Sequence, residues 1–318
     1  MAGQRPARSD VRLGVRIFAV ASLLALAVVV FRLAIPASPP PSPAVATVAA
    51  PAPTAPVASA PPTPALAQVA VSPTPAVLAP AATPQASFGS RRPIVCLDPG
   101  HGGADLGNVR LDNNLIALRE KDLTLATALA LASRLRTDGF DVVLTRTTDA
   151  EVNPSDADVN GDGTVAPSGG DAQTDQLDDL QARVNVCNAA HADLLLSIHY
   201  NGAANHALAG YEVWYNDHRP FSDRNLAFAD MLHSALGAAY AGVGYQANDR
   251  GIGADDLAVL GPARPGKLVP SAMPGALVEG LFLSNDQDAQ FIMSEHGLAT
   301  IVGADEAAIK AYFAKYPV

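Results

Sequence analysis

Two histidines stand at the ends of apolar runs, in positions where a protein could bind a metal ion. His101 follows the run 94–98 across a Pro-Gly pair, and His199 ends the run 192–198. Each run has the length of a buried strand, and the Asp-Pro-Gly sequence prevents the first strand from continuing. Open α/β sheets gather their ligands at the carboxyl ends of strands. We therefore expect the two imidazoles to meet there and to bind one metal ion.

Two glutamates could complete such a site. A catalytic zinc ion takes three protein ligands, imidazoles and carboxylates, and keeps one position open. Glu120 opens a predicted helix and is the best third ligand, although a glutamate in a first helical turn is more often a partner of the helix dipole. Glu279 ends the apolar run 273–278, where an ionised carboxylate is costly to bury without an opposite charge nearby. An ion pair with an arginine such as Arg250 is the alternative for Glu279.

The segments that must position these residues alternate between strand and helix. Strands are predicted from short apolar runs, and helices from leucines and alanines at helical spacing. The predicted strands are 94–98, 140–145, 192–199, 210–215 and 275–279, and the predicted helices are 118–137, 178–190, 223–236 and 299–315. This alternation predicts an α/β fold, a three-layer sandwich with a mixed, mostly parallel central sheet and helices on both faces.

The chain divides into three segments. Residues 1–35 combine a basic flank with the apolar run 17–31, which is typical of a signal peptide or a membrane anchor. No clean cleavage site follows, so an uncleaved signal-anchor with its arginines in the cytoplasm is favoured over a secreted form. Residues 36–90 are rich in Pro and Ala and predict a disordered linker. Residues 91–318 form the predicted folded domain, on the extracytoplasmic side, in the periplasm or the cell wall.

Net charge and cysteine content further narrow the class of protein. The net charge is −10, which argues against a nucleic-acid binder because such a protein needs a basic face. The two cysteines, Cys96 and Cys187, are too few for a disulfide framework. Both lie in or beside apolar segments. They are predicted to be buried free thiols, and a disulfide between them is the alternative.

An acidic insertion at 149–175 resembles half of a calcium-binding loop. Asp158, Asn160 and Asp162 supply oxygens at the first, third and fifth positions of an EF-hand loop, and a glycine stands at the sixth. Gly169 occupies the twelfth position, where a bidentate acid is expected. The acids that could replace it are Asp156, Asp171 and Asp175. Calcium binding and a solvated acidic loop both stay open, and the loop is slightly favoured.

Four motifs occur in order along the folded domain. They are LDPGHGG at 97–103, REKD at 119–122, SIHYNG at 197–202 and LVEGLFLSN at 277–285. Together they resemble the zinc-dependent N-acetylmuramoyl-L-alanine amidases, the bacterial cell-wall enzymes with a type 3 catalytic domain. Two shorter segments, LTR at 144–146 and LQAR at 180–183, also fall where the family has them. One departure is Gly280, which directly follows the glutamate where the family more often has its glycine one residue later.

The resemblance implies a zinc site and a reaction. His101, Glu120 and His199 would bind Zn²⁺, and Glu279 would be the catalytic carboxylate that moves a proton. The bond cut would join the lactyl group of N-acetylmuramic acid to the L-alanine of the stem peptide, so that peptidoglycan is the expected partner in wall remodelling or turnover. The residues expected beside the zinc ligands or the substrate are Asp98, Asn201 and Arg250.

Two other functions fit the same residues. A zinc peptidase that cuts within the stem peptide would use the same metal chemistry. A wall-binding module without turnover would keep the fold but not the reaction, and the presence of all four polar residues argues against it. The sequence indicates no protein regulator.

Overall fold

The computed structural model describes residues 90–318, with the exception of 114, 164, 166–171, 262–268 and 295. The predicted membrane segment and all but the last residue of the predicted linker lie outside the described residues. Within the described part of the chain, no helix combines the length and the apolar character needed to cross a membrane.

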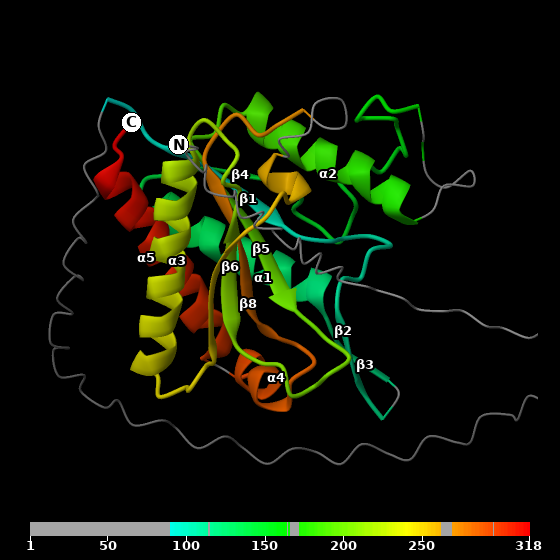
Figure 1. Ribbon diagram of the computed structural model, residues 1–318, viewed down its shortest axis with the longest axis vertical. Helices are drawn as coiled ribbons and strands as arrows, with labels where there is room; N and C mark the ends of the chain where they lie inside the picture. The colour runs from blue at the N-terminus through cyan, green and yellow to red at the C-terminus, as the bar shows by residue number, and fades with distance from the viewer. Residues whose placement is uncertain (1–89, 114, 164, 166–171, 262–268, 295) are drawn as a thin grey trace, which may run out of the picture. The chain divides into compact units, whose positions relative to one another are not determined.

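A six-stranded mixed sheet forms the centre of the domain (Figure 1). In spatial order its strands are β4 (Asp141–Leu144), β1 (Ile94–Pro99), β5 (Leu194–Asn201), β8 (Gly275–Phe282), β6 (Tyr211–Tyr215) and β7 (Asp249–Ala254). The first four strands are parallel, β6 runs antiparallel to β8, and β7 is parallel to β6. This arrangement confirms the predicted mixed, mostly parallel sheet.

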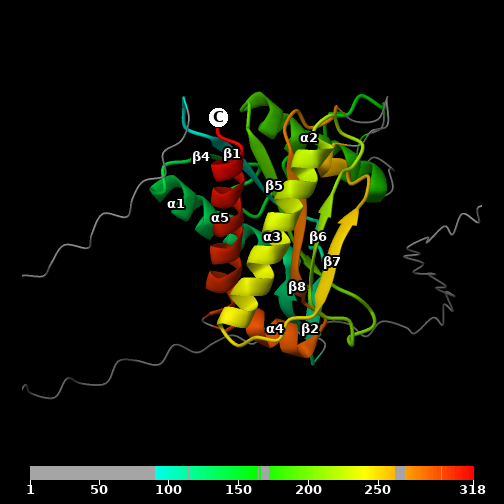
Figure 2. The same cartoon turned by 60° about the vertical axis from the view of Figure 1, so that its left-hand side comes forward.

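Helices cover both faces of the sheet, as the sequence predicts (Figures 1 and 2). The larger core lies between one face and the helices α1 (Glu120–Thr137), α3 (Ser222–Gly242) and α5 (Gly297–Lys315). The smaller core lies on the other face, beneath α2 (Ala172–Ala189) and the short 3₁₀ helix η1 (Ala258–Leu260). A short helix, α4 (Asp286–Ile292), follows β8.

The alternation of side chains along β5 decides which face carries polar chemistry. Leu196 and Ile198 enter the larger core, whereas Leu195 belongs to the smaller one. Because successive side chains of a strand point to opposite faces, Ser197 and His199 share the face of Leu195. His199 therefore lies on the face that carries α2, beyond the part of it that the smaller core fills.

Several predicted element boundaries are wrong, and the helix predicted to end at residue 236 continues to Gly242. The helix predicted from residue 118 begins at Glu120, because β3 (Leu115–Arg119) pairs with β2 (Val109–Asp112) in a separate hairpin. The helix predicted from residue 178 begins at Ala172, so the end of the predicted insertion is helical. β7 and α4 were not predicted, since one is rich in glycine and the other is shorter than a clear helical pattern requires.

The two cysteines are buried, as predicted, but they are not free thiols, and the alternative of a disulfide is confirmed. Cys96 of β1 and Cys187 of α2 form a disulfide, with their Cα atoms 5.6 Å apart. Both residues belong to the smaller core, because Cys96 lies on the α2 face of its strand and Cys187 lies on the buried side of its helix. The bond ties the sheet to α2.

Candidate active site

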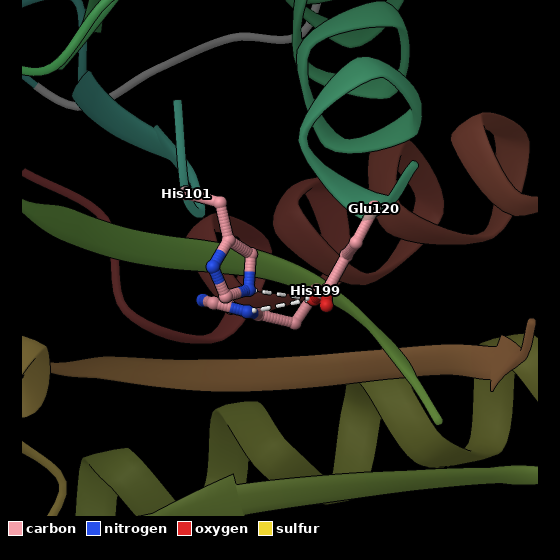
Figure 3. A group of neighbouring side chains, drawn as sticks. All are labelled: His101, Glu120 and His199. Carbon is pink, nitrogen blue, oxygen red and sulfur yellow. Dashed lines mark hydrogen bonds and ion pairs between the residues drawn. The ribbon is translucent and has the colours of Figure 1, made fainter. Parts of the chain in front are cut away.

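Three of the predicted metal ligands converge at the carboxyl end of the parallel strands (Figure 3). His101 Nε2 and His199 Nδ1 each lie 3.0 Å from the same oxygen of Glu120, Oε1. One ligand atom from each residue lies within 4.8 Å of the others. Two imidazoles and a carboxylate at this spacing fit the donor set of a zinc ion that keeps a further position open. The structure therefore brings the predicted trio together.

The loop after β1 is shaped to allow this convergence. A Cβ atom at Gly100 would lie 2.2 Å from Cε1 of His199, so only glycine leaves room for that ring. His101 itself adopts a left-handed backbone with φ of 61°. Residues with a side chain rarely take this conformation, and strained positions of this kind cluster at functional sites.

The imidazole of His101 is oriented by a carboxylate that sequence reasoning missed. His101 Nδ1 lies 2.8 Å from Oδ2 of Asp105, and this contact turns the other ring nitrogen, Nε2, towards Oε1 of Glu120. Burial lowers the pKa of His101, but the hydrogen bonds to Asp105 and Glu120 outweigh it and raise that pKa to about 10. A bound metal ion would take the place of the Nε2 proton. The only sequence signal for Asp105 is its position four residues after His101.

Glu120 is held as an ionised ligand. Its Oε2 accepts hydrogen bonds from the backbone N–H (2.7 Å) and the side-chain amide (2.9 Å) of Asn108. Its Oε1 also accepts the backbone N–H of Tyr200 at 3.0 Å. Burial raises the pKa of Glu120, yet the hydrogen bonds and charges of the two histidines lower it well below its usual range. Asn108 was not predicted, and it lies in a loop without a recognisable pattern.

Glu279 has the opposite environment. It is the register neighbour of His199 across β5 and β8, so both side chains point to the same face. Its Oε2 is buried and has no hydrogen-bond partner among the described residues. Burial, followed by the negative charges of Glu120 and Glu212, raises the pKa of Glu279 well above its usual range. The alternative ion pair with Arg250 is wrong, because Arg250 contacts Glu212 instead.

Asp98 is buried beneath the loop that carries His101. Its carboxylate accepts hydrogen bonds from Thr145 Oγ1 (2.6 Å), Ser197 Oγ (2.8 Å) and Arg183 Nη1 (2.9 Å). The other terminal nitrogen of Arg183 donates to the backbone carbonyl of His101 at 2.7 Å. Asp98 thus reaches the loop through Arg183, and the carboxylate on the imidazole is Asp105. Thr145 and Arg183 stand in the short segments 144–146 and 180–183 of the sequence pattern.

Asn201 and Arg250 meet at a residue that was not predicted. Asn201 Nδ2 donates to Oε1 of Glu212 at 2.7 Å, and Arg250 Nε donates to Oε2 of Glu212 at 2.8 Å. Glu212 is the register neighbour of Glu279 across β6 and β8. The signal that could have found Glu212 is a single carboxylate within the otherwise apolar strand 211–215.

Among the described residues, the acidic insertion contacts the His101 loop only at its start, where Asp149 and Glu151 accept the backbone N–H groups of Gly103 and Ala104. Its calcium-loop residues make other contacts. Asp158 Oδ2 accepts the backbone N–H of Gly163 at 3.0 Å, and Asn160 Oδ1 accepts that of Asp162 at 2.8 Å. Asp156 takes a left-handed backbone with φ of 49°. Asp171 and the twelfth loop position lie outside the described residues. Among the described histidines, cysteines and acids, the only group that could hold a metal ion is the one at His101, so calcium binding stays a prediction.

Comparison with known proteins gives one family. The model of the N-acetylmuramoyl-L-alanine amidase family matches residues 95–311. The germination-specific N-acetylmuramoyl-L-alanine amidase of Bacillus subtilis (strain 168) is 34% identical over 122 residues, which are 38% of this chain and 44% of that protein. The matched stretch thus spans less than half the length of that relative.

Two solved amidase structures share the fold. The N-acetylmuramoyl-L-alanine amidase of Clostridium difficile 630 is 27% identical, with a TM-score of 0.53 over 71% of this chain and 98% of that one. The catalytic domain of CwlV from Bacillus (Paenibacillus) polymyxa var. colistinus is 26% identical, with a TM-score of 0.51 over 70% of this chain and 98% of that one. The match covers almost all of each of these two chains, so the folded domain here is similar to a whole amidase catalytic domain.

Proposed function

We propose a reaction for this chain from one premise, which is that it belongs to the N-acetylmuramoyl-L-alanine amidase family. The protein hydrolyses the amide between the lactyl group of N-acetylmuramic acid and the L-alanine of the stem peptide in peptidoglycan. The observation that carries the proposal is the meeting of His101, Glu120 and His199 beside Glu279, whose buried oxygen lacks a partner among the described residues.

Each residue of the site has a separate role in the proposed hydrolysis. A zinc ion held by His101, Glu120 and His199 would polarise the scissile carbonyl and lower the pKa of the attacking water. Glu279 takes the proton from that water and passes it to the departing amine of L-alanine. Its unpartnered oxygen and its raised pKa favour uptake of a proton at this position. Asp105 bonds Nδ1 of His101 and so holds the ring with Nε2 directed to the metal position.

Asp98 acts as a positioning residue for the His101 loop. Its ion pair with Arg183 is almost completely buried, with 1% and 4% of the two side chains exposed. The hydrogen bond from Arg183 to the His101 carbonyl links that ion pair to the strained backbone of the loop. Removing one partner of a buried pair leaves an uncompensated charge, so Asp98 and Arg183 must be present together.

Digestion of purified peptidoglycan tests the reaction. We expect the zinc-loaded protein to release stem peptides that begin with L-alanine and to leave free lactyl groups on the glycan, which mass spectrometry identifies. New amino-acid termini within the stem would make the protein a peptidase. Wall binding with zinc present and no product would make it a binding module. A chelator should stop product release, and added zinc should restore it.

We also propose that residues 1–35 tether the enzyme to the membrane, with the catalytic domain in the periplasm or the cell wall. The sequence supports this through the basic flank followed by the apolar run 17–31. Fractionation of cells tests the tether. Full-length protein should stay in the membrane fraction after a high-salt wash, and a shortened soluble form would contradict it.

A further inference from the structure

Three neighbouring strands place one polar side chain each on the same face, beginning at the metal-ligand trio. His199 of β5 is the register neighbour of Glu279 of β8, and Glu279 is the register neighbour of Glu212 of β6. Residues paired across strands point to the same face, so the three side chains form a row. The row leads from the trio towards β7, at the edge of the sheet.

A bulge in β7 adds a fourth member to the row. Tyr211 pairs with Asp249 and Val213 pairs with Ile252, so Glu212 alone stands opposite the two residues Arg250 and Gly251. Gly251 has a φ of 85°, the left-handed backbone that such bulges use glycine to reach. Bulges redirect side chains, and here the Arg250 side chain meets Glu212.

The guanidinium of Arg250 is fixed at one end and available at the other. Its Nε donates to Glu212 at 2.8 Å, and its Cζ lies 4.9 Å from the centre of the Phe282 ring. Glu212 is itself held by the amide of Asn201. The Arg250 side chain is 33% exposed, and its two terminal nitrogens make no hydrogen bond to the described protein groups. A planar fork held in this way presents two parallel donors, which matches a carboxylate.

We propose that Arg250 binds a carboxylate of the stem peptide, and that Glu212 is the positioning residue that holds Arg250 for it. This inference rests on the proposed amidase function. Adjacent strands lie about 4.8 Å apart, so the row from β8 to β7 spans roughly 10 Å, and the Arg250 side chain leans back over β6. An extended peptide advances about 3.3–3.6 Å per residue. The distance from Glu279 to the Arg250 guanidinium therefore fits a carboxylate on the second stem residue, counted from the scissile amide.

Kinetics with two matched substrates test the proposal. The substrates are muramoyl peptides that differ only at the second stem residue, which carries a free α-carboxylate in one and a carboxamide in the other. We expect the zinc-loaded full-length protein to prefer the carboxylate by roughly 10- to 100-fold in kcat/KM, the range for hydrogen bonds to a charged group. Arg250→Gln should bring this ratio close to one, mainly through KM, and Arg250→Lys should restore part of it.

Two further variants separate positioning from general damage. Glu212→Gln should reduce the ratio while Arg250 is still present, because the guanidinium loses its anchor. Arg224→Gln is the matched control, because Arg224 also stacks on an aromatic ring, that of Tyr316. Arg224 lies near the first residue of β8, since its neighbour Asn225 accepts the N–H of Gly275, whereas Glu279 lies further along that strand. The control should keep both the ratio and the turnover of the unaltered protein.

The outcomes distinguish this inference from the proposed function. Cleavage of neither substrate by the unaltered protein would remove the proposed function. Cleavage of both with a ratio near one, or an unchanged ratio in Arg250→Gln, would overturn the carboxylate site alone. A third substrate with an amidated C-terminus identifies the group: a preference that follows that end would overturn the assignment to the second stem residue.

Discussion

Two glutamates face the same space and have opposite surroundings. Glu120, at the start of α1, is 1% exposed, and both of its oxygens accept hydrogen bonds. Glu279, in the middle of β8, has a buried oxygen without a hydrogen-bond partner among the described residues. The pKa of Glu120 is lowered by the histidines beside it, whereas that of Glu279 is raised by burial and by neighbouring carboxylates.

This difference separates a ligand from a proton carrier. A metal ligand must stay ionised, and the hydrogen bonds from Asn108 and Tyr200 hold Glu120 in that form. A group that binds and releases a proton needs surroundings that stabilise its ionised form less strongly. Pairs of acids whose pKa values are pushed apart by their surroundings are typical of enzymes that assign them different roles. Burial alone does not decide the role, since both carboxylates are deeply placed.

Replacing each glutamate with glutamine should give the largest difference between the two residues. Glu120→Gln removes a ligand charge, so we expect it to lose both zinc and turnover. Glu279→Gln keeps the trio, so we expect full zinc content with turnover reduced roughly 10²- to 10⁴-fold, the usual share of general acid–base catalysis. Metal analysis and stem-peptide release measure the two effects. Near-normal turnover in Glu279→Gln would contradict its role, and zinc loss there would make it a ligand.

A third buried acid, which is not part of the metal-ligand group, tests the effect of burial alone on a carboxylate. Asp305 of α5 is fully buried, neither of its oxygens has a partner among the described residues, and burial raises its pKa from 3.8 to about 8. The folded protein therefore holds a proton that the unfolded chain releases, and stability should fall as pH rises from about 4 to about 8. Asp305→Asn removes this loss, so its Tm should exceed that of the unaltered protein by an amount that grows with pH.

Thermal unfolding between pH 4.5 and 8.5 measures that gain, which we expect to reach a few kcal/mol at the alkaline end, at about 1.4 kcal/mol per pKa unit discounted for relaxation. Turnover should persist in Asp305→Asn, in contrast to Glu279→Gln. A Tm difference that does not change with pH would show that Asp305 is not the group responsible.

The smallest expected effect concerns the carboxylate behind His101. Asp105→Asn keeps the shape of the side chain but weakens its hold on the Nδ1 proton. We expect zinc affinity to fall roughly 10- to 100-fold, the usual effect of altering a residue that orients a ligand. Competition with a chelating dye measures it. Asp112→Asn, on the exposed hairpin strand β2, is the control and should bind zinc like the unaltered protein.

The sequence by itself was sufficient for the elements and for the four residues at the centre of the site. Short apolar runs and helical spacing depend on neighbours in the chain, so they identified five of the six strands of the central sheet and the long helices. His101, Glu120, His199 and Glu279 follow from the same logic, because each stands where a predicted strand ends or a predicted helix begins. The four motifs then connected these residues to one family.

Only the tertiary structure decided what surrounds those four residues. The bond between Cys96 and Cys187 depends on which face of β1 meets α2, and the sequence left that open. The contact of Glu212 with Arg250 depends on a bulge that shifts the register of β7, and no local pattern marks it. Sequence patterns report periodicity along the chain, whereas the partners of a buried charge come from segments that meet only after folding. The ligands were therefore readable in the sequence, and the groups that tune them were not.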